Sequence, residues 1–421
     1  MESFSLRFEM IGEIPGRCSG SSRDLRHIDI GGRVEKRCNQ VGRFVAMVMF
    51  LSLGSAVLPA LGLAQLINGG QPNPDVIGIG ETISYTFTAQ ANADVNFRIG
   101  QTSTTAFRPR LTVFDPSGAP AAPSVCGSSG VADVSFNASS TGTYSVDVQN
   151  CAGSAAVGSY NLYFVAPPGA NEGGSLLNGG EPSSGSIDFG DLDSYTFVAS
   201  TGEGVQLRIG KIGGTPAFRP RFNVYGPTGA LEESTCPTGN IGASLFTAPS
   251  SGVYTVVVLD CFSSGNQTGT YDLYFTRAPG ANELGSLNDG LLRNEQIDIG
   301  DLDSYTFSAK AGDSIEVTAQ VDGAANRAPR FTLYDPTGAS DFTSPETACN
   351  SGIASHSFTA GTGTYTLVVY DCAANAQEAW PYVISLTGAT GAPAPAVPSL
   401  PFAGLFALAS LLVGAGVTRL R

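Results

Sequence analysis

Short stretches of alternating hydrophobic and polar residues, each closed by a turn sequence, run through most of this chain. Apolar side chains occupy every second position at Tyr195, Phe197 and Ala199. This two-residue period is that of a half-buried β-strand. After a glycine-rich turn the alternation resumes at Val205, Leu207 and Ile209. No long apolar pattern with the 3.6-residue period of a helix occurs between the two ends of the chain, so the pattern predicts β-strands.

The same set of strands recurs three times. Gly-Asp-Leu-Asp-Ser-Tyr-Thr-Phe spans residues 190–197 and again 300–307, and a degenerate copy spans residues 80–87, which sets a period of 110 residues. Further on, each copy carries a turn with proline second and glycine fourth, the signature of a type I turn. About seven strands per repeat, separated by turns, predict an antiparallel β-sandwich in each copy.

The chain therefore divides into three repeats, which we call modules 1, 2 and 3, and two unlike ends. The predicted modules are jelly-roll-like β-sandwiches of residues 65–170, 171–280 and 281–388, each large enough to bury its own core. The remaining segments are a signal-peptide region, residues 1–64, a Pro/Ala linker, residues 389–399, and an apolar tail, residues 400–421. We expect this tail and the signal sequence to form helices.

The N-terminal region has the features of a secretory signal peptide. Four basic residues between positions 33 and 43 precede an apolar run over residues 44–63, and small residues allow cleavage before Gln65. Signal peptidase is thus a predicted partner. Residues 1–33 precede a complete signal without resembling one, so we expect translation to begin near Val34, with a long positively charged leader as the alternative.

Each module contains two cysteines at a nearly constant separation. The expected pairs are Cys126 with Cys151, Cys236 with Cys261 and Cys349 with Cys372. Closing a loop of this length stabilises a domain by about 3 kcal/mol in the chain-entropy model. Disulfides require an oxidising compartment, in agreement with the signal peptide. A zinc site is the alternative, but no Cys-x-x-Cys spacing or accompanying histidine supports it.

The C-terminal tail has the composition of a membrane span. Eighteen largely apolar residues, 400–417, are long enough to cross a bilayer, and Arg419 and Arg421 would remain cytoplasmic. Val-Pro-Ser-Leu-Pro at residues 397–401, the apolar segment and the basic end together resemble PEP-CTERM sorting tails. The resemblance implies an exosortase-type processing enzyme as partner, and a plain membrane anchor is the alternative.

The chain is acidic, with 36 Asp and Glu against 22 Lys and Arg and a net charge of −14. A nucleic-acid partner requires clustered basic residues that replace the counterions of the phosphates. The composition therefore excludes nucleic acid, and it suits an extracellular protein or one that attracts cations.

The order of motifs in the modules resembles the bacterial pre-peptidase C-terminal (PPC) domain. These motifs are Gly-Asp-x-Asp-x-Tyr-x-Phe, Tyr-Asp-Pro-x-Gly, Thr-Gly-Thr-Tyr-x-Val-x-Val and Gly-x-Tyr-x-Leu. Modules 2 and 3 carry them best, whereas module 1 has Glu81 and Ile83 at the two acidic positions. The resemblance implies a non-catalytic jelly-roll-like domain of exported proteins, which in some collagenases binds collagen with calcium nearby.

Paired carboxylates are the first candidates for a functional site. Asp191 and Asp193, like Asp301 and Asp303, lie two residues apart at the start of a strand and so share a face. Ca²⁺ takes six to eight oxygen ligands, which such loops can provide, and capping of the turn is the alternative. A hydrolase built on these pairs is the enzymatic alternative, although glycosidases place their two carboxyls across a cleft.

Arginines recurring in the modules are the second candidates. Beside an aromatic residue on the outward face of a sheet, they could bind an acidic polysaccharide, and pairing with nearby aspartates is the alternative. The predicted ligand surface consists of Arg98, Arg108, Arg110, Arg208, Arg219, Arg221, Tyr225 and Arg330.

Together these features predict a non-catalytic, secreted protein tethered to the bacterial cell surface. Its expected role is binding or structural, in the envelope or extracellular matrix, with an extracellular polysaccharide or protein as ligand and no cofactor other than Ca²⁺. The alternatives are an extracellular hydrolase and an inert surface spacer.

Overall fold

The structure is a computed structural model that describes residues 63–103, 107–151, 156–262, 265–323, 328–345, 349, 352–372 and 379–391. The predicted tail and almost all of the predicted signal region lie outside these residues. Within the described residues, no helix has the length and apolar character needed to span a membrane. All described residues belong to one compact unit, Leu61–Arg421.

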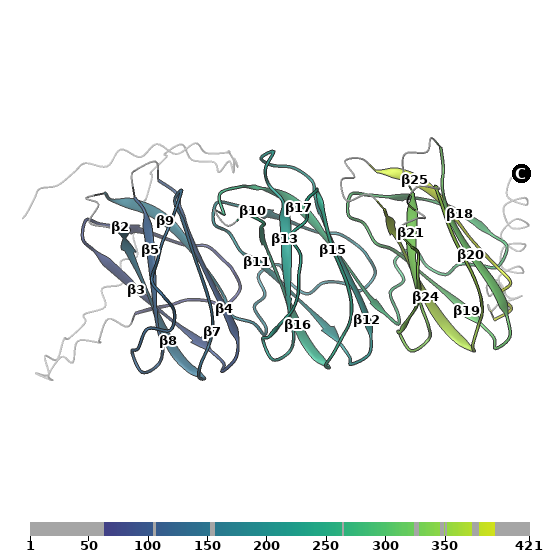
Figure 1. Cartoon of the computed structure of the whole chain (residues 1–421), viewed down its shortest axis with the longest axis horizontal. Coiled ribbons are helices and arrows are strands. Elements are labelled where there is room, and N and C mark those ends of the chain that lie inside the picture. Colours follow the sequence, from purple (N-terminus) through teal and green to yellow (C-terminus); the bar gives the residue numbers. More distant parts are fainter. Residues whose placement is uncertain are drawn as a thin grey trace, which may run out of the picture. The chain divides into compact units, whose positions relative to one another are not determined.

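Two facing β-sheets form module 1, which contains β1 to β9 (Figure 1). The first sheet has the order β1 (Ala64–Gln65), β3 (Thr82–Ala89), β8 (Gly142–Asn150), β5 (Pro109–Phe114) and β6 (Val125–Cys126). The second sheet has the order β2 (Asn73–Ile77), β9 (Gly158–Val165), β4 (Asp94–Gln101) and β7 (Val131–Asn137).

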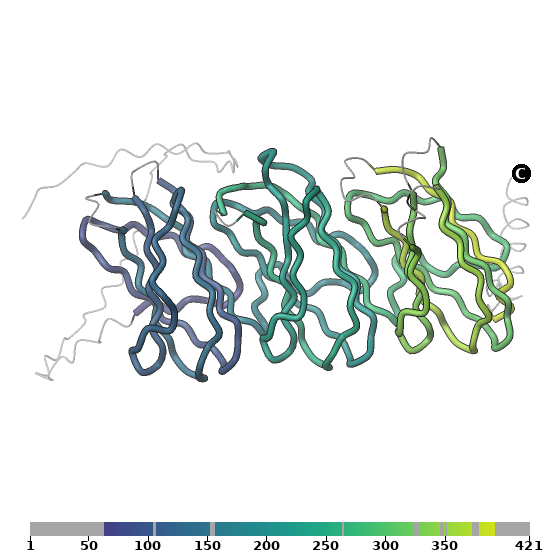
Figure 2. The backbone as a smooth tube through the Cα atoms, in the orientation of Figure 1, coloured from purple at the N-terminus to yellow at the C-terminus, as the bar shows by residue number. Residues whose placement is uncertain are grey.

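Modules 2 and 3 repeat this arrangement, as the tube in Figure 2 shows. In module 2 the first sheet is β11 (Asp193–Ala199), β16 (Gly252–Asp260), β13 (Pro220–Tyr225) and β14 (Leu231–Ser234), and the second is β10 (Ser183–Ile187), β17 (Gly269–Ala278), β12 (Gly204–Lys211) and β15 (Ile241–Thr247). In module 3 the first is β19 (Asp303–Ala309), β24 (Gly363–Asp371), β21 (Pro329–Tyr334) and β22 (Ser340–Thr343), and the second is β18 (Leu292–Ile297), β25 (Trp380–Thr387), β20 (Ser314–Val321) and β23 (Ile353–Thr359).

This order is that of a jelly roll. Numbered from β10 to β17, the eight strands of module 2 form one sheet of order 1-8-3-6 and one of order 2-7-4-5, and every pairing in both sheets is antiparallel. The prediction of antiparallel β-sandwiches is confirmed. For modules 2 and 3 the predicted count of about seven strands is one too low, because the short edge strand, Leu231–Ser234 in module 2, has no alternating pattern.

The residues predicted to point inward form the cores. Val205, Leu207 and Ile209 are fully buried between the two sheets of module 2. Phe197 stacks on Tyr254 with ring centroids 5.0 Å apart, and the Tyr254 hydroxyl donates to the Ser250 carbonyl at 2.7 Å. The recurring tyrosine after the Gly turn therefore fills the core and fixes the turn that precedes it.

All three predicted disulfides form. Their Cα atoms lie 5.8, 5.5 and 5.4 Å apart for Cys126–Cys151, Cys236–Cys261 and Cys349–Cys372, within the normal range for a disulfide. Cys151, Cys261 and Cys372 each directly follow the central strand of the first sheet, β8, β16 or β24. Each bridge therefore joins two segments of one module.

Candidate functional site at the module boundaries

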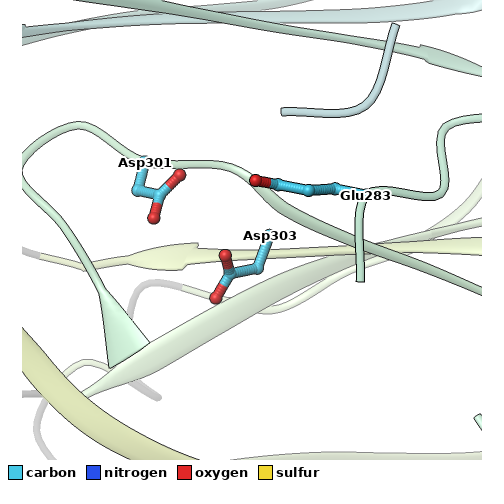
Figure 3. Close-up of side chains that lie close together, drawn as sticks. All are labelled: Glu283, Asp301 and Asp303. Carbon is cyan, nitrogen blue, oxygen red and sulfur yellow. The ribbon is translucent and has the colours of Figure 1, made fainter. Parts of the chain in front are cut away.

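Three carboxylates gather where module 3 begins (Figure 3). Glu283 comes from the linker before β18, Asp301 from the turn before β19, and Asp303 is the first residue of β19. Their nearest oxygens lie within 4.8 Å of one another. The sequence pattern predicted both aspartates as candidate metal ligands, but it did not predict Glu283. The signal was present in the linker, since Gly-Ala-Asn-Glu ends at Glu283 and, in module 2, at Glu172.

Three of these six carboxylate oxygens accept hydrogen bonds from the protein. Asp301 caps its turn: Oδ1 accepts from the Leu302 amide at 2.7 Å and Oδ2 from the Asp298 amide at 3.1 Å. Asp303 Oδ2 accepts from the Tyr382 hydroxyl at 2.6 Å. The buried oxygen Oε2 of Glu283 has no hydrogen-bond partner. The cluster therefore combines turn capping, one of the predicted alternatives, with an unused acceptor.

Burial shifts the titration of these carboxyls. In module 2, burial raises the pKa of Asp191 to about 6. Burial and then the Asp191 charge raise the pKa of Asp193 to about 8 and that of Glu172 to about 7. In module 3, burial and then the Asp301 charge raise the pKa of Asp303 and of Glu283. Near neutral pH both clusters therefore retain protons, because further ionisation would bury uncompensated negative charge.

Two of the predicted surface arginines are buried between modules. Arg98 is 1% exposed, binds Asp133 Oδ2 through Nε at 2.9 Å and donates to the Asp191 carbonyl of module 2 at 3.4 Å. Arg208 is 4% exposed and donates to the Asp371 carbonyl of module 3 at 3.0 Å. The expectation that these side chains face solvent is wrong, because the outer face of the second sheet in modules 1 and 2 is covered by the next module.

The other residues of the predicted ligand surface are scattered over different environments. Tyr225 is buried and Arg108 is exposed. The remaining four are half-buried, namely Arg110, Arg219, Arg221 and Arg330. Arg219 and Arg330 lie over the rings of Phe262 and Tyr370. These residues therefore do not form one continuous exposed surface.

Apolar side chains and close backbone contacts join successive modules. One buried cluster brings Tyr163 and Val165 of β9 against Val257 and Leu259 of β16. The matching cluster between modules 2 and 3 consists of Tyr274, Ala278, Leu302, Tyr334, Val368 and Tyr370. The turn after β13 also contacts the preceding module, because the Asp94 amide donates to the Gly229 carbonyl at 3.3 Å. The outer face of one second sheet therefore packs on the outer face of the next first sheet.

The two outermost faces are polar at the positions that form these contacts. On module 1, Asp147 stands where modules 2 and 3 have Val257 and Val368. On module 3, Thr318 stands where modules 1 and 2 have Arg98 and Arg208. Terminal repeats of stacked proteins need a polar outer face for solubility. These polar replacements therefore occur on the outer faces that no neighbouring module covers.

We expect the stability of the protein, measured without divalent cations, to fall as pH rises from about 4 to about 8. The folded pKa of Asp193, about 8, lies above its ordinary value of 3.8, so its contribution is complete below pH 3.8 and is lost as pH rises through 8. Asp193→Asn should reduce this loss in the free energy of unfolding by a few kcal/mol, since one pKa unit corresponds to about 1.4 kcal/mol. Urea unfolding across this range measures it, and an unchanged slope would contradict it. Exposed Asp341→Asn is the control.

Comparison with known proteins identifies one family in the chain. Residues 81–150 match the bacterial pre-peptidase C-terminal domain. The match lies in module 1, although the motifs pointed more strongly to modules 2 and 3. No curated protein matches the sequence significantly.

Solved structures give only weak similarity. Tripeptidyl peptidase 2 (TPP II) has 11% identity over 71% of this chain and 32% of that chain, with a TM-score of 0.18. A triple jelly roll protein from the turret of an archaeal virus has 10% identity over 76% and 88%, with a TM-score of 0.17. The M60 catalytic domain with CBM51-1 and CBM51-2 of Clostridium perfringens ZmpB has 11% identity over 77% and 36%, with a TM-score of 0.16.

The chain spans about a third of the length of the peptidase and ZmpB structures. These TM-scores are too low to support a conclusion on fold or function. The family match is the informative comparison: residues 81–150, inside the first jelly roll, are similar to the bacterial pre-peptidase C-terminal domain.

Proposed function

We propose that this protein is a non-catalytic scaffold or binding protein of the bacterial cell surface, built from three PPC-like modules. The observation that supports the proposal is that polar side chains at the module boundaries bind the neighbouring module. Arg98 and Arg208 are buried there and donate to backbone carbonyls of the following module. Arginines predicted to face a ligand thus join one module to the next.

Two further features support an extracellular location. PPC domains occur in bacterial extracellular proteins, and the chain contains one. Each module also carries a disulfide, which persists in oxidising surroundings. We propose tethering through the apolar segment 400–417, with an exosortase-type enzyme processing it.

The hydrolase alternative has little support from the geometry. Asp303 is 3% exposed and Asp301 is 7% exposed, and their carboxylates lie close together beside Glu283 (Figure 3). Two hydrolytic carboxyls instead flank a substrate that reaches both. His356 stacks against Phe342 with centroids 3.7 Å apart, and burial lowers its pKa. It therefore serves as a packed aromatic ring on β23.

We propose that the cluster of Glu283, Asp301 and Asp303 holds Ca²⁺. The donors are all oxygens, as Ca²⁺ prefers, and Glu283 offers a buried oxygen with no partner. A bound cation would neutralise carboxylates whose ionisation burial opposes. Calcium at 100 times its Kd should stabilise the protein by about 2.7 kcal/mol. Calorimetric titration of the full chain tests this; Glu283→Gln should remove the heat and Asp322→Asn, an exposed control, should not. No heat with the unaltered protein would refute the site.

Fractionation of the native host tests the proposed function. The protein should be recovered from the cell surface or its surroundings, and surface protease treatment of intact cells should remove it. Intact-mass measurement with and without reductant should show two hydrogens gained for each disulfide. A mass beginning at Gln65 and ending before Leu400 would support processing at both ends. Recovery from the cytoplasm with reduced cysteines would overturn the proposal.

A further inference from the structure

The boundary between modules 1 and 2 contains an open cavity of about 630 Å³. This volume lies within the range of small-molecule sites, about 300–1,000 Å³. Module 1 contributes Asn96 and Arg98 of β4, and module 2 contributes Asn223 and Tyr225 of β13 together with Asp260 at the end of β16. The cavity is therefore a composite site that exists only because the two modules are joined.

The polar groups of this cavity can both donate and accept hydrogen bonds. The Tyr225 hydroxyl accepts from Asn96 Nδ2 at 3.2 Å and from Asn223 Nδ2 at 3.3 Å, which leaves its own proton available. Asp260 also lines the cavity, but both of its carboxylate oxygens are buried, and the backbone amides of Arg219, Phe262 and Gln267 lie against this carboxylate. The exposed acceptor in the cavity wall is the Asp133 carboxylate, because this side chain is 40% exposed.

Charge in the cavity is nearly balanced, and apolar rings complete its wall. Arg98 is paired with Asp133, so its charge is already compensated within module 1. Asp94, Asp260 and Arg221 are the other charged groups in the wall. Phe136 and Phe262 also line it, and Phe262 is 39% exposed. A neutral ligand with several hydroxyls and an apolar ring face meets all of these groups.

The boundary between modules 2 and 3 has different side chains at the corresponding positions. The partner of Arg98 across the strands is Asp133, whereas the partner of Arg208 is Ala243. Likewise, Leu259 of the first boundary corresponds to Tyr370 of the second. The Tyr370 ring lies 5.0 Å from the Arg208 guanidinium and 5.6 Å from that of Arg330. A ring therefore occupies the second boundary at the position where the first has a smaller side chain.

We propose that the cavity between modules 1 and 2 binds a short segment of a neutral glycan. The sugar hydroxyls donate to the exposed Asp133 carboxylate and accept from Tyr225 and Asn223, and the apolar face of a sugar ring packs on Phe262. Hydroxyl groups serve both as donors and as acceptors, which this mixture of carboxylate, amide and phenol requires. This inference rests on the proposed binding role and gives it a ligand class different from the acidic polysaccharide expected from the arginines.

The test is isothermal titration of the full chain with neutral tetrasaccharides of known structure, namely cellotetraose, maltotetraose and mannotetraose, and with tetragalacturonate as the charged probe. We expect saturable binding of one ligand per chain for at least one neutral probe, and weaker binding of tetragalacturonate. Binding of none of the neutral probes, or of tetragalacturonate alone, would overturn the proposal.

The decisive variant is Leu259→Tyr, which copies the second boundary. The added ring should fill the cavity and reduce affinity at least tenfold, and it should leave the fold intact because Tyr370 occupies the equivalent position. Ser385→Tyr, at the position of Tyr274 on the outer face of module 3, is the matched control and should bind as the unaltered protein does. Equal affinity of a folded Leu259→Tyr protein would refute the site.

A second variant distinguishes a lower ligand affinity caused by the changed cavity from one caused by misfolding. Asn223→Thr copies Thr332 of module 3, so it should preserve packing while it removes an amide from the cavity wall. We expect a several-fold lower affinity, and an unchanged affinity would count against the site. Failure to find the protein at the cell surface would overturn the proposed function without altering these binding results.

Discussion

Replacement of Gly210 by valine should separate module 2 from module 3. A Cβ atom at this position would lie 2.0 Å from the Ile299 carbonyl oxygen, and a backbone atom cannot move aside as a side chain can. Overpacking of this kind costs about 1–3 kcal/mol or more. We expect the apparent Tm of module 3 to fall by roughly 10 °C, since 1 kcal/mol shifts a domain of this size by about 4–8 °C. Calorimetry and hydrogen exchange measure the effect.

Hydrogen exchange of individual backbone amides tests this prediction at the boundary itself. The Gly204 amide, which donates to the Gly338 carbonyl at 2.9 Å across the boundary, should lose protection. The Asp94 amide, which makes the equivalent bond between modules 1 and 2, should keep it. Gln320→Val is the matched control, because Gln320 occupies the Gly210 position on the exposed outer face of module 3. A protected Gly204 amide in Gly210→Val would show that the boundary tolerates the side chain.

Removal of the disulfide of module 2 should be the second large effect. The bridge between Cys236 and Cys261 closes a loop of 25 residues. The chain-entropy model assigns such a loop about 3 kcal/mol, a large share of the stability of one domain. The double variant Cys236→Ala, Cys261→Ala should therefore unfold module 2 at a temperature roughly 10–20 °C lower. Thermal unfolding of the full chain, followed calorimetrically, measures this.

Reductant provides the control for the disulfide prediction. It should lower the stability of modules 1 and 3 in the variant, where Cys126–Cys151 and Cys349–Cys372 remain, and it should have no further effect on module 2. A loss below about 1 kcal/mol in the double variant would mean that native packing of module 2 does not depend on the bridge.

The sequence was sufficient for the interior of each module. The alternation at Val205, Leu207 and Ile209 identified the inward face of β12, because a strand turns successive side chains to opposite sides whatever surrounds it. The nearly constant cysteine spacing identified all three disulfides, because the pairs lie within one repeat. These features depend on contacts inside one copy, and the repeat displays each contact three times.

Sequence reasoning failed where one module meets the next. Arg98 and Arg208 were assigned to an exposed face, yet both are buried. The period of a strand shows which residues point away from their own core, but water and a neighbouring module are equally compatible with that direction. Glu283 was missed because it joins Asp301 and Asp303 only through the path of the linker.

By itself, the sequence therefore determined that this protein consists of three disulfide-bonded β-sandwiches, because strand period, turn chemistry and cysteine spacing are local properties of a repeat. Only the tertiary structure decided which outer faces are covered, which carboxylates meet and that Leu259 leaves a polar cavity where Tyr370 lies against arginines. The physical reason is that these features depend on the fit between two folded surfaces, and a change of one side chain can open or close it.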